Sequence, residues 1–565
     1  MRRTVAIGIQ DFGDLIQKKC FYIDKTLLIK EWWESNDSVT LINRPRRFGK
    51  TLNISMLEQF FSINYAEKGE WFENLAIWEH EEYRKMQGTY PVISLSFARV
   101  KEKNLEDTKT KIGRIIKDAF KSYSFIKNSN LLTEVDREFW DRILAENISD
   151  VDAAESIHQL SFFLYRYYGK KVIILLDEYD TPMQEAFVKG FWDDLVDFTR
   201  SLFNSSFKTN PYLDRALMTG ITRVSKESIF SDLNNLEVVT TTSDKYATFF
   251  GFTEEEVFNA LEECGLENKK TAVKSWYDGF IFGNHKDIYN PWSILNFLDK
   301  GKLGAYWANT SANSLVGKLL REGNRNLKES FEMLLRGEHI FTSLDEQIVY
   351  NQLNGNEKAV WSLLLASGYL KVLSVEEYGD FVVDTEPLYE LALTNLEVRV
   401  MFNNMIRSWF LDSESDYNYF LKALLQDDRK AMNAYMNRVA LNTFSYFDTG
   451  NKPSGAEPER FYHGFVLGLL VELQRDYVIT SNRESGFGRY DVMIEPKNPA
   501  EHDAIILEFK VYDEADEASL EDTVEAALRQ IEEKQYAVQL EARGIPKERI
   551  RCYGLAFQGK KVLIG

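Results

Sequence analysis

Short runs of β-forming apolar residues alternate with amphipathic helical stretches over residues 1–250. The runs that we expect to form strands are Val39–Ile42, Pro91–Ser96, Val172–Leu176 and Arg215–Thr219. Because strands separated by helices of this length need crossover connections, the pattern predicts a parallel sheet covered by helices. The N-terminal part of the chain is therefore expected to be an α/β domain.

The hydrophobic pattern becomes mainly helical after residue 250. Thr253 followed by three glutamates is typical of a helix start, and helical patterns continue over residues 251–345, which we expect to form a lid-like region. Within residues 346–450, a helix is followed by two short apolar runs, YLKVLSV and DFVVD, and then by further helices. This order predicts a winged-helix-like module and a helical linker region.

The last part of the chain predicts a separate α/β domain. Asn451–Glu459 contains two prolines and a glycine and is the clearest linker. Residues 455–565 follow the order helix, strand, strand, helix, strand.

Length and composition limit the classes of protein that remain. A chain of 565 residues is too long for one hydrophobic core. It contains no run of about 18 apolar residues, so we expect no membrane partner, and the N-terminus lacks the apolar core of a signal peptide. The three cysteines are far apart and form no CxxC pair, which argues against a disulfide framework or a zinc knuckle and predicts a cytoplasmic protein.

The net charge of −19 argues against a large non-specific nucleic-acid surface, because neutralising phosphates requires clustered lysines and arginines. A local basic groove on an acidic protein is still compatible with this charge.

The segment from Leu41 to Thr51 lies between an expected strand and an expected helix, which is the setting of a phosphate-binding loop. Backbone amides of such a loop cradle phosphates. Lys50 would reach the β- and γ-phosphates, and the Thr51 hydroxyl would bind Mg²⁺. Arg44 stands where such loops usually have their first glycine. The residues expected to contact the nucleotide are Arg46, Arg47, Phe48, Gly49, Lys50 and Thr51.

A second motif supports the nucleotide site. The apolar run Val172–Leu176 ends in Asp177 and Glu178. Asp177 would hold Mg²⁺ through water, and Glu178 would polarise the attacking water. Taken alone, the motif is also compatible with a core strand followed by solvated acids, but the two motifs together, in this order, favour the nucleotide site.

The strand Arg215–Thr219 offers two further candidates. Thr219 and Arg223 would lie where a polar group can sense the γ-phosphate. A turn with ordinary polar residues explains them equally well.

Five unusual strings occur in order over about residues 8–310: FYIDKT (Phe21–Thr26), NRPRRFGKTLN, LLDEYDTPM, TGITRVSKESIFSDLNNL, and YDGF with YNPWS. They resemble a family of bacterial proteins with an AAA-ATPase-like domain, in which the RPRRFGKT form of the loop is typical. The resemblance implies ATP binding and a relation to signalling-type ATPases. ATPases of this general class often assemble, which is compatible with a homo-oligomer. By its position before the loop, FYIDKT is expected to line the adenine side.

A second constellation of polar residues lies near the C-terminus. One β-run carries Asp491, and the next carries Glu508 and Lys510. The period of two places Glu508 and Lys510 on one face of their strand, and a hairpin would bring Asp491 to Glu508. Two carboxylates suit Mg²⁺ or Mn²⁺, and such a metal lowers the pKa of a bound water. Lys510 would position that water or stabilise the phosphate, so the set predicts phosphodiester hydrolysis.

Glu-x-Lys alone is a common strand pattern, so the assignment of a nuclease site depends on the sequence on either side of it. SNRESGFGRYDVMIEP before it and ALRQIEEKQYA after it resemble the PD-(D/E)xK pattern of restriction-endonuclease-like folds, over about residues 455–565. The resemblance implies that Gln530 is a supporting catalytic residue. The upstream helix offers Glu459 or His463 to the metal, although a solvated acid is the favoured interpretation of Glu459. Arg489 is either a phosphate contact or a surface arginine.

Residues 456–565 hold 14 Lys/Arg and 21 Asp/Glu, so nucleic-acid binding would need another domain or a confined basic patch formed by Arg475, Arg483, Arg489 and Lys497. The acidic run Asp513–Asp522 would repel DNA and is interpreted as a solvated loop in preference to an autoinhibitory element.

The leading hypothesis is an ATP-regulated, metal-dependent nuclease, with DNA favoured over RNA. The alternative is a nucleotide-dependent signalling or scaffold ATPase whose C-terminal domain binds nucleic acid without cutting it. A translocating motor lacks support, because no helicase motif accompanies the two nucleotide motifs. A role in defence or in mobile-element biology follows only from the combination of domains.

Overall fold

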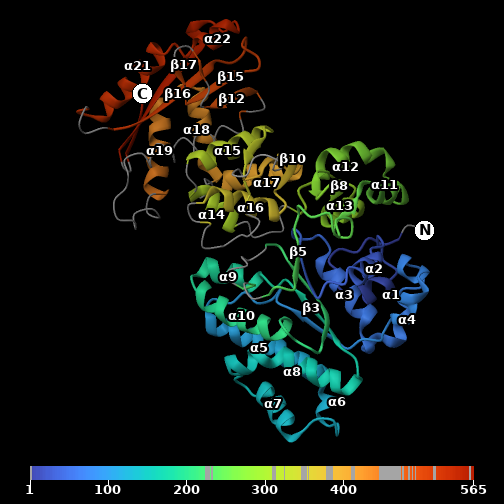
Figure 1. Ribbon diagram of the computed structural model, residues 1–565. Coiled ribbons are helices and arrows are strands. Elements are labelled where there is room, and N and C mark those ends of the chain that lie inside the picture. Colours follow the sequence, from blue (N-terminus) through green and yellow to red (C-terminus); the bar gives the residue numbers. More distant parts are fainter. Residues whose placement is uncertain are drawn as a thin grey trace, which may run out of the picture. The chain divides into compact units, whose positions relative to one another are not determined.

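The computed structural model describes residues 3–222, 229–230, 233–307, 314–322, 325–344, 353, 356–376, 386–408, 414–443, 473, 476–481, 484–485, 488–489, 491–512, 517–558 and 561–565. The chain divides into two compact units, Met1–Met401 and Phe402–Gly565 (Figure 1), and each is described by itself. The four-part division expected from the sequence is finer than this, and its bounds stay a prediction. Within the described residues, no helix is both long and apolar enough to cross a bilayer.

The described part of the first unit contains a parallel sheet with the strand order β2-β3-β4-β1-β5. Its strands are β1 (Val39–Asn43), β2 (Val92–Ser96), β3 (Val172–Asp177), β4 (Leu213–Gly220) and β5 (Leu236–Val239). The expected parallel sheet is confirmed. Strands β1 and β3 are buried along their whole length, which is why their sequences are mainly apolar and do not alternate with exposed polar residues.

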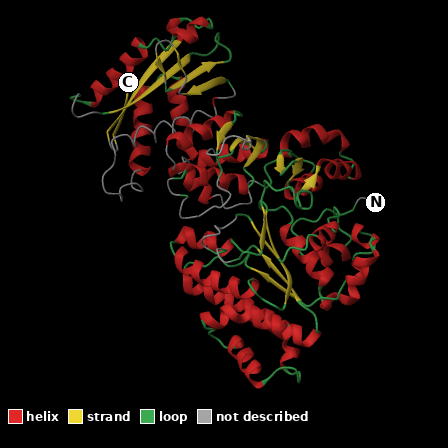
Figure 2. Ribbon diagram, viewed as in Figure 1, coloured by secondary structure: helices red, strands yellow, loops and turns green. Residues whose placement is uncertain are grey.

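Helices connect these strands and surround the sheet (Figure 2). Those that follow β1, β2 and β3 are α3 (Lys50–Phe61), α4 (Glu81–Met86), α5 (Leu105–Ser122), α6 (Ser124–Lys127), α7 (Glu134–Leu144), α8 (Asp150–Tyr168), α9 (Thr181–Lys189) and α10 (Trp192–Phe207). Two short helices, α1 (Phe12–Gln17) and α2 (Leu27–Glu34), precede β1.

The strand order decides what lies at the carboxyl edge of this sheet. Strand β4 pairs with β1 on one side and with β3 on the other. Because all three strands are parallel, the loop after β1, the carboxylates after β3 and the polar end of β4 lie at the same edge.

A smaller α/β part follows within the first unit. It contains α11 (Glu254–Glu263), α12 (Lys270–Tyr277) and α13 (Pro291–Lys300), together with a sheet of order β6-β8-β7 formed by β6 (Phe252–Thr253), β7 (Phe280–Phe282) and β8 (His285–Tyr289). Thr253 and Glu256 form a capping box at the start of α11, which confirms the helix start expected there. Phe21, from the N-terminal segment, packs into the apolar core of this part.

The last part of the first unit consists of helices and a sheet of order β10-β11-β9. Its elements are α14 (Ser314–Glu322), α15 (Arg325–Arg336), β9 (Ile340–Thr342), α16 (Glu357–Ala366), β10 (Leu370–Glu376), β11 (Leu388–Leu393) and the start of α17 (Leu396–Ser408), a helix that continues past the boundary at Met401. The run YLKVLSV forms β10 as expected. The run DFVVD lies outside the described residues, and the partner of β10 is Leu388–Leu393. The winged-helix-like interpretation stays a prediction.

The second unit has a mixed sheet of order β12-β15-β16-β17-β18, in which β16 and β17 are parallel and the other pairs are antiparallel. The strands are β12 (Tyr477–Ser481), β15 (Val492–Pro496), β16 (Ala504–Val511), β17 (Ile550–Gln558) and β18 (Lys561–Ile564), with a separate small hairpin of β13 (Glu484–Ser485) and β14 (Gly488–Arg489). The helices are α18 (Glu414–Leu425), α19 (Arg429–Thr443), α21 (Leu520–Glu533) and α22 (Val538–Ala542).

Helices α18 and α19 belong to this second unit and cover one face of its sheet. Leu507 and Phe509 of β16 share an apolar cluster with residues of both helices. At the edge of the sheet, Asn433 and Asn437 of α19 each donate to a backbone carbonyl of β18 and accept from a backbone amide of the same strand, at 2.6 to 3.0 Å. These amides satisfy the unpaired backbone groups of an edge strand, which would otherwise be open to pairing with another chain.

Candidate functional sites

The loop after β1 wraps around Lys50. Gly49 has a φ of 80° and Arg47 a φ of 65°, and this left-handed backbone turns the chain into α3. The Lys50 side chain is buried, and its Nζ donates to the carbonyl oxygens of Arg44 and Pro45 at 2.8 and 2.9 Å. Burial lowers the pKa of Lys50. A cation held among neutral carbonyls inside a loop is suited to receive phosphate oxygens.

Asp177 joins two other predicted residues at the carboxyl edge of the sheet. Thr51 Oγ1 donates to one Asp177 carboxylate oxygen at 2.7 Å, and Thr219 Oγ1 donates to the other at 2.6 Å. Asp177 is buried, and burial raises its pKa. A carboxylate beside a hydroxyl, next to a buried lysine, provides the hard oxygen ligands that Mg²⁺ prefers.

Glu178 lies directly after Asp177 with a backbone φ of 50°, which is rare for a residue with a Cβ. Its backbone amide is 3.4 Å from Thr219 Oγ1, and its carboxylate accepts from Thr181 Oγ1 at 3.1 Å. Its negative charge raises the pKa of Lys50. The sequence-predicted set Lys50, Thr51, Asp177, Glu178 and Thr219 is therefore brought together.

Arg44, which replaces the usual first glycine, ties the loop to a segment about 200 residues later in the chain. It is fully buried and donates to the carbonyls of Asn43, Thr240 and Lys245. Its guanidinium stacks over the Phe282 ring at 4.5 Å. Burial lowers the pKa of Arg44 to about 9. Arg44 thus anchors the loop to Thr240, Lys245 and Phe282.

Other loop residues are held by the part that follows the sheet. The ring of Phe48 is fully buried and lies 4.8 Å from that of Phe280 and 5.4 Å from that of Phe282, measured between centroids. Arg47 stacks over Trp292 at 4.3 Å. Phe280 belongs to the string YDGF and Trp292 to YNPWS, so both strings contact the loop. The sequence alone assigns no role to these two strings. Whether Arg47 and Phe48 also contact a nucleotide stays a prediction.

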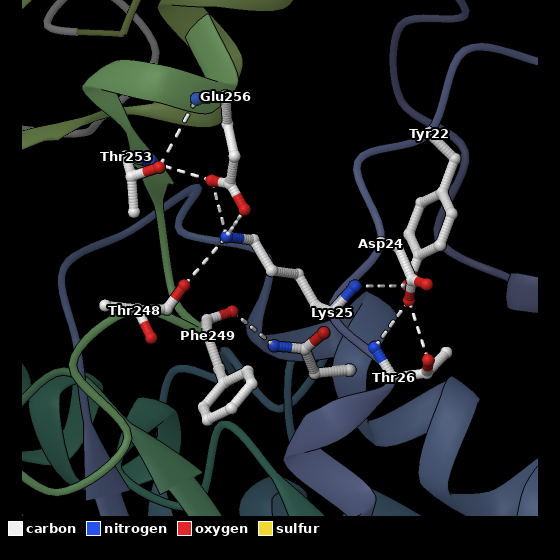
Figure 3. A network of polar contacts seen from close by, with 9 residues as sticks. Tyr22, Asp24, Lys25, Thr26, Thr248, Phe249, Thr253 and Glu256 are labelled. Carbon is white, nitrogen blue, oxygen red and sulfur yellow. Dashed lines mark hydrogen bonds and ion pairs between the residues drawn. The ribbon is translucent and has the colours of Figure 1, made fainter. Parts of the chain in front are cut away.

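The string FYIDKT forms a polar network with the start of α11 (Figure 3). Lys25 Nζ lies 2.6 Å from both carboxylate oxygens of Glu256 and 2.7 Å from the Thr248 carbonyl. Asn53 of α3, the helix that follows the phosphate loop, donates to the next carbonyl, that of Phe249, at 3.1 Å. The described contacts therefore give Lys25 a structural role, and a place for FYIDKT beside the adenine stays a prediction.

Replacing Lys25 with methionine should destabilise the first unit. The ion pair is largely buried, with side-chain exposures of 8% for Lys25 and 26% for Glu256. Removing the cation therefore leaves the Glu256 carboxylate largely buried without a compensating positive charge. Urea unfolding should show a loss on the order of 3 kcal/mol for Lys25→Met, with much of it recovered in the double variant Lys25→Met/Glu256→Gln. Lys18→Met, at an exposed pair with Asp14, is the matched control and should change little. A Lys25→Met protein as stable as the wild type would contradict this role.

In the second unit, the β15–β16 hairpin places Asp491 beside Glu508. The pairing of Val492 with Leu507 fixes this register. The Asp491 carboxylate accepts from the Phe509 amide at 2.8 Å, and the Asp491 amide lies 3.4 Å from a Glu508 carboxylate oxygen. The two predicted metal ligands are therefore adjacent.

Gln530 reaches the same place from α21. Its Nε2 donates to the Glu508 carboxylate and to Tyr536 Oη, the latter at 3.2 Å. Gly554, paired with Glu508 across β16 and β17, permits this approach, because a Cβ there would lie 2.7 Å from the Val524 carbonyl of α21.

Glu508 and Lys510 lie on the face opposite Leu507 and Phe509, since side chains alternate along β16. Lys510 is half-buried, and its positive charge lowers the pKa of Glu508. Burial, and then the charge of Asp491, outweigh this effect and raise the pKa of Glu508 to about 8. A buried carboxylate that is repelled by a second, partly exposed one fits a divalent cation.

Several expected residues lie outside the described part of the chain. These are Arg223, Glu459, His463, Arg475, Arg483 and residues 513–516, together with the side chain of Arg489.

Comparisons with known proteins match both ends of the chain. Residues 6–230 match a family described as "Predicted AAA-ATPase", and residues 457–565 match the PD-(D/E)XK nuclease superfamily. Both resemblances inferred from the sequence are thereby confirmed. A relative from Azotobacter chroococcum mcd 1, "Uncharacterized protein in vnfD 5'region", is 24% identical over 568 residues, covering 98% of this chain and 96% of the relative.

Proposed function

We propose that this chain, which carries an AAA-ATPase-like domain and a PD-(D/E)XK nuclease domain, is an ATP-regulated, metal-dependent nuclease that hydrolyses phosphodiester bonds, with DNA favoured over RNA. The observation that carries this proposal is the adjacency of Asp491, Glu508 and Gln530, with Lys510 on the same strand face. A domain that only binds nucleic acid has no need of two adjacent carboxylates, one of which, that of Glu508, is buried.

In the nuclease site, Asp491 and Glu508 would hold Mg²⁺ or Mn²⁺. When bound, the metal supplies an activated water and stabilises charge on the phosphate. Gln530 fixes the orientation of the Glu508 carboxylate through its amide hydrogen bond. Lys510 would position the water or stabilise the negative charge that develops on the phosphate.

In the nucleotide site, Lys50 would exchange its two loop carbonyls for phosphate oxygens of ATP. Thr51 and Asp177 would hold Mg²⁺, with Thr219 orienting the Asp177 carboxylate. Glu178 would polarise water for hydrolysis. The contacts of the loop with Phe280, Phe282 and Trp292 support regulation by ATP. Through these contacts, a change in the loop on nucleotide binding would act on the smaller α/β part that contains α11, α12 and α13.

Metal binding to the nuclease site should depend on pH. Glu508 has a pKa raised to about 8 without metal, so it must lose a proton to become a ligand at neutral pH. The apparent affinity for Mn²⁺ should therefore fall about tenfold per pH unit as the pH is lowered from 8 to 6, and level off above about pH 9. Titration calorimetry in buffers of different ionisation enthalpy should detect release of about one proton at pH 7. Glu508→Gln should abolish this release, and an affinity that is constant from pH 6 to pH 9 would contradict the assignment.

The proposal is tested by incubating wild type with single- and double-stranded DNA and RNA in Mg²⁺ or Mn²⁺, with and without ATP. Cleavage of one of these substrates is expected. Binding without cleavage in every combination would favour the alternative, a nucleotide-dependent scaffold that binds nucleic acid without cutting it.

A further inference from the structure

The loop arginines make different contacts. Arg44 is buried against Phe282, and Arg47 stacks on Trp292. Arg46 is half-buried, and its Nη2 donates to Gln184 Oε1 of α9 at 3.2 Å. Arg46 follows Pro45, whose carbonyl accepts from Lys50 Nζ at 2.9 Å, and Gln184 lies in the first turns of α9, the helix that begins just after Asp177 and Glu178.

The backbone of Arg46 is fixed as well as its side chain. Its carbonyl accepts from Trp307 Nε1 at 3.0 Å, and Asn290 Nδ2 lies 3.4 Å from the same oxygen. With its carbonyl held by these two residues and its guanidinium held by Gln184, Arg46 has a defined position before any ligand binds. Such pre-ordering reduces the entropy that binding would otherwise cost.

The side-chain amide of Gln184 lies between two charged groups, the Arg46 guanidinium and the Asp180 carboxylate. Its Nε2 donates to Asp180 Oδ2 at 3.1 Å. Asp180 is fully buried, and the same oxygen accepts from the amides of Ile221 and Thr222 and from Thr222 Oγ1, each at 3.0 Å.

An ionised carboxylate only accepts hydrogen bonds, and a guanidinium only donates them. A glutamine amide has both a donor and an acceptor, so it can accept from Arg46 and donate to Asp180 at the same time. If the amide were flipped, both hydrogen bonds would be lost. A glutamate would place a second negative charge against Asp180, and a leucine would make neither bond.

We propose that Gln184 is a positioning residue that presents Arg46 to the terminal phosphate of a nucleoside triphosphate, so that the site distinguishes the triphosphate from the diphosphate. The inference rests on the proposed binding of ATP and adds a residue and a selectivity to it. Lys50 lies inside the loop and would reach the β-phosphate, which both nucleotides carry, as well as the γ-phosphate. Arg46 adds a second cation for the charge that only the triphosphate carries. Charge-assisted hydrogen bonds of this kind are about twice as strong as neutral ones.

The test measures the dissociation constants of ADP and of a non-hydrolysable ATP analogue for the full-length protein in Mg²⁺, by calorimetry. Gln184→Leu should weaken binding of the triphosphate analogue about tenfold and that of ADP less than twofold. Arg46→Gln should show the same selective loss. Because Gln184 acts through Arg46, the double variant should bind the analogue about as weakly as Arg46→Gln alone. Glu185→Gln, on the same helix and paired with Lys189, is the matched control and should bind both nucleotides as the wild type does.

An equal loss of both nucleotides in Gln184→Leu, or losses that add in the double variant, would overturn the positioning role. If Gln184→Leu does not fold, Arg46→Gln decides alone, and unchanged discrimination in that variant overturns the inference. A wild-type protein that binds neither nucleotide would overturn the proposed ATP site itself, and the inference with it. Normal wild-type binding combined with unselective variants overturns only the inference.

Discussion

Asp491→Asn should lower the rate of nucleic-acid cleavage by about 10³-fold or more, because it removes a charged ligand from the metal on which the chemistry depends. The asparagine oxygen can still accept the hydrogen bond that the Phe509 amide now donates to the carboxylate, so the hairpin should keep its register. The dissociation constant of ATP should not change, since Asp491 lies in a different compact unit from the nucleotide site. Single-turnover cleavage in Mn²⁺ and nucleotide binding by calorimetry measure the two quantities.

The matched control for this variant is Asp503→Asn. Asp503 precedes the same strand, β16, but binds Arg549 and Arg551 away from Glu508. Its replacement should cost some stability and leave the cleavage rate of the folded protein within a few-fold of wild type. An Asp491→Asn protein that cleaves at the wild-type rate would show that the metal site has been assigned to the wrong residues.

Lys50→Ala should weaken ATP binding by about 100-fold, because it removes the buried cation that we propose faces the phosphates. The loss should extend to ADP, which separates Lys50 from the selective role proposed for Arg46. Since the change also leaves the Arg44 and Pro45 carbonyls without their donor, Lys50→Met, which keeps more of the side-chain volume, should be measured beside it. Lys18→Ala, at an exposed pair, is the control. ATP binding that survives in both Lys50 variants would contradict the phosphate-loop assignment.

Local sequence patterns were sufficient for the strands that are buried on both faces. The runs Val39–Ile42 and Val172–Leu176 are apolar except for Thr40, and both belong to strands that are not at an edge of the sheet. By contrast, Leu236–Val239 at the edge of the sheet is mostly half-exposed and was not predicted, because a short, partly polar edge strand has neither a continuous apolar run nor a clear alternation. Helices α18 and α19 were expected as helices, but the sequence did not show what they pack against. An amphipathic helix shows that one face is buried but does not identify the element that buries it.

The two candidate sites also differ in how much of each could be predicted from the sequence. Asp491 and Glu508 could be placed together because one hairpin connects them, and the period of a strand then fixes the face of each side chain. The links of the phosphate loop to Phe282, Trp292 and Gln184 join residues 138 or more positions apart in the sequence. No local pattern encodes such contacts, so they became visible only in the folded chain.

The central claim is that ATP at the first unit controls cleavage by the second. The most direct test is the cleavage rate of wild type and Lys50→Ala in Mn²⁺, each measured with and without ATP on the substrate that wild type cuts. The account predicts a wild-type rate that changes about tenfold or more with ATP, which corresponds to a coupling free energy within the usual range for linked sites, and a Lys50→Ala rate that does not respond. A wild-type rate that is the same with and without ATP, and equal to that of Lys50→Ala, would contradict it.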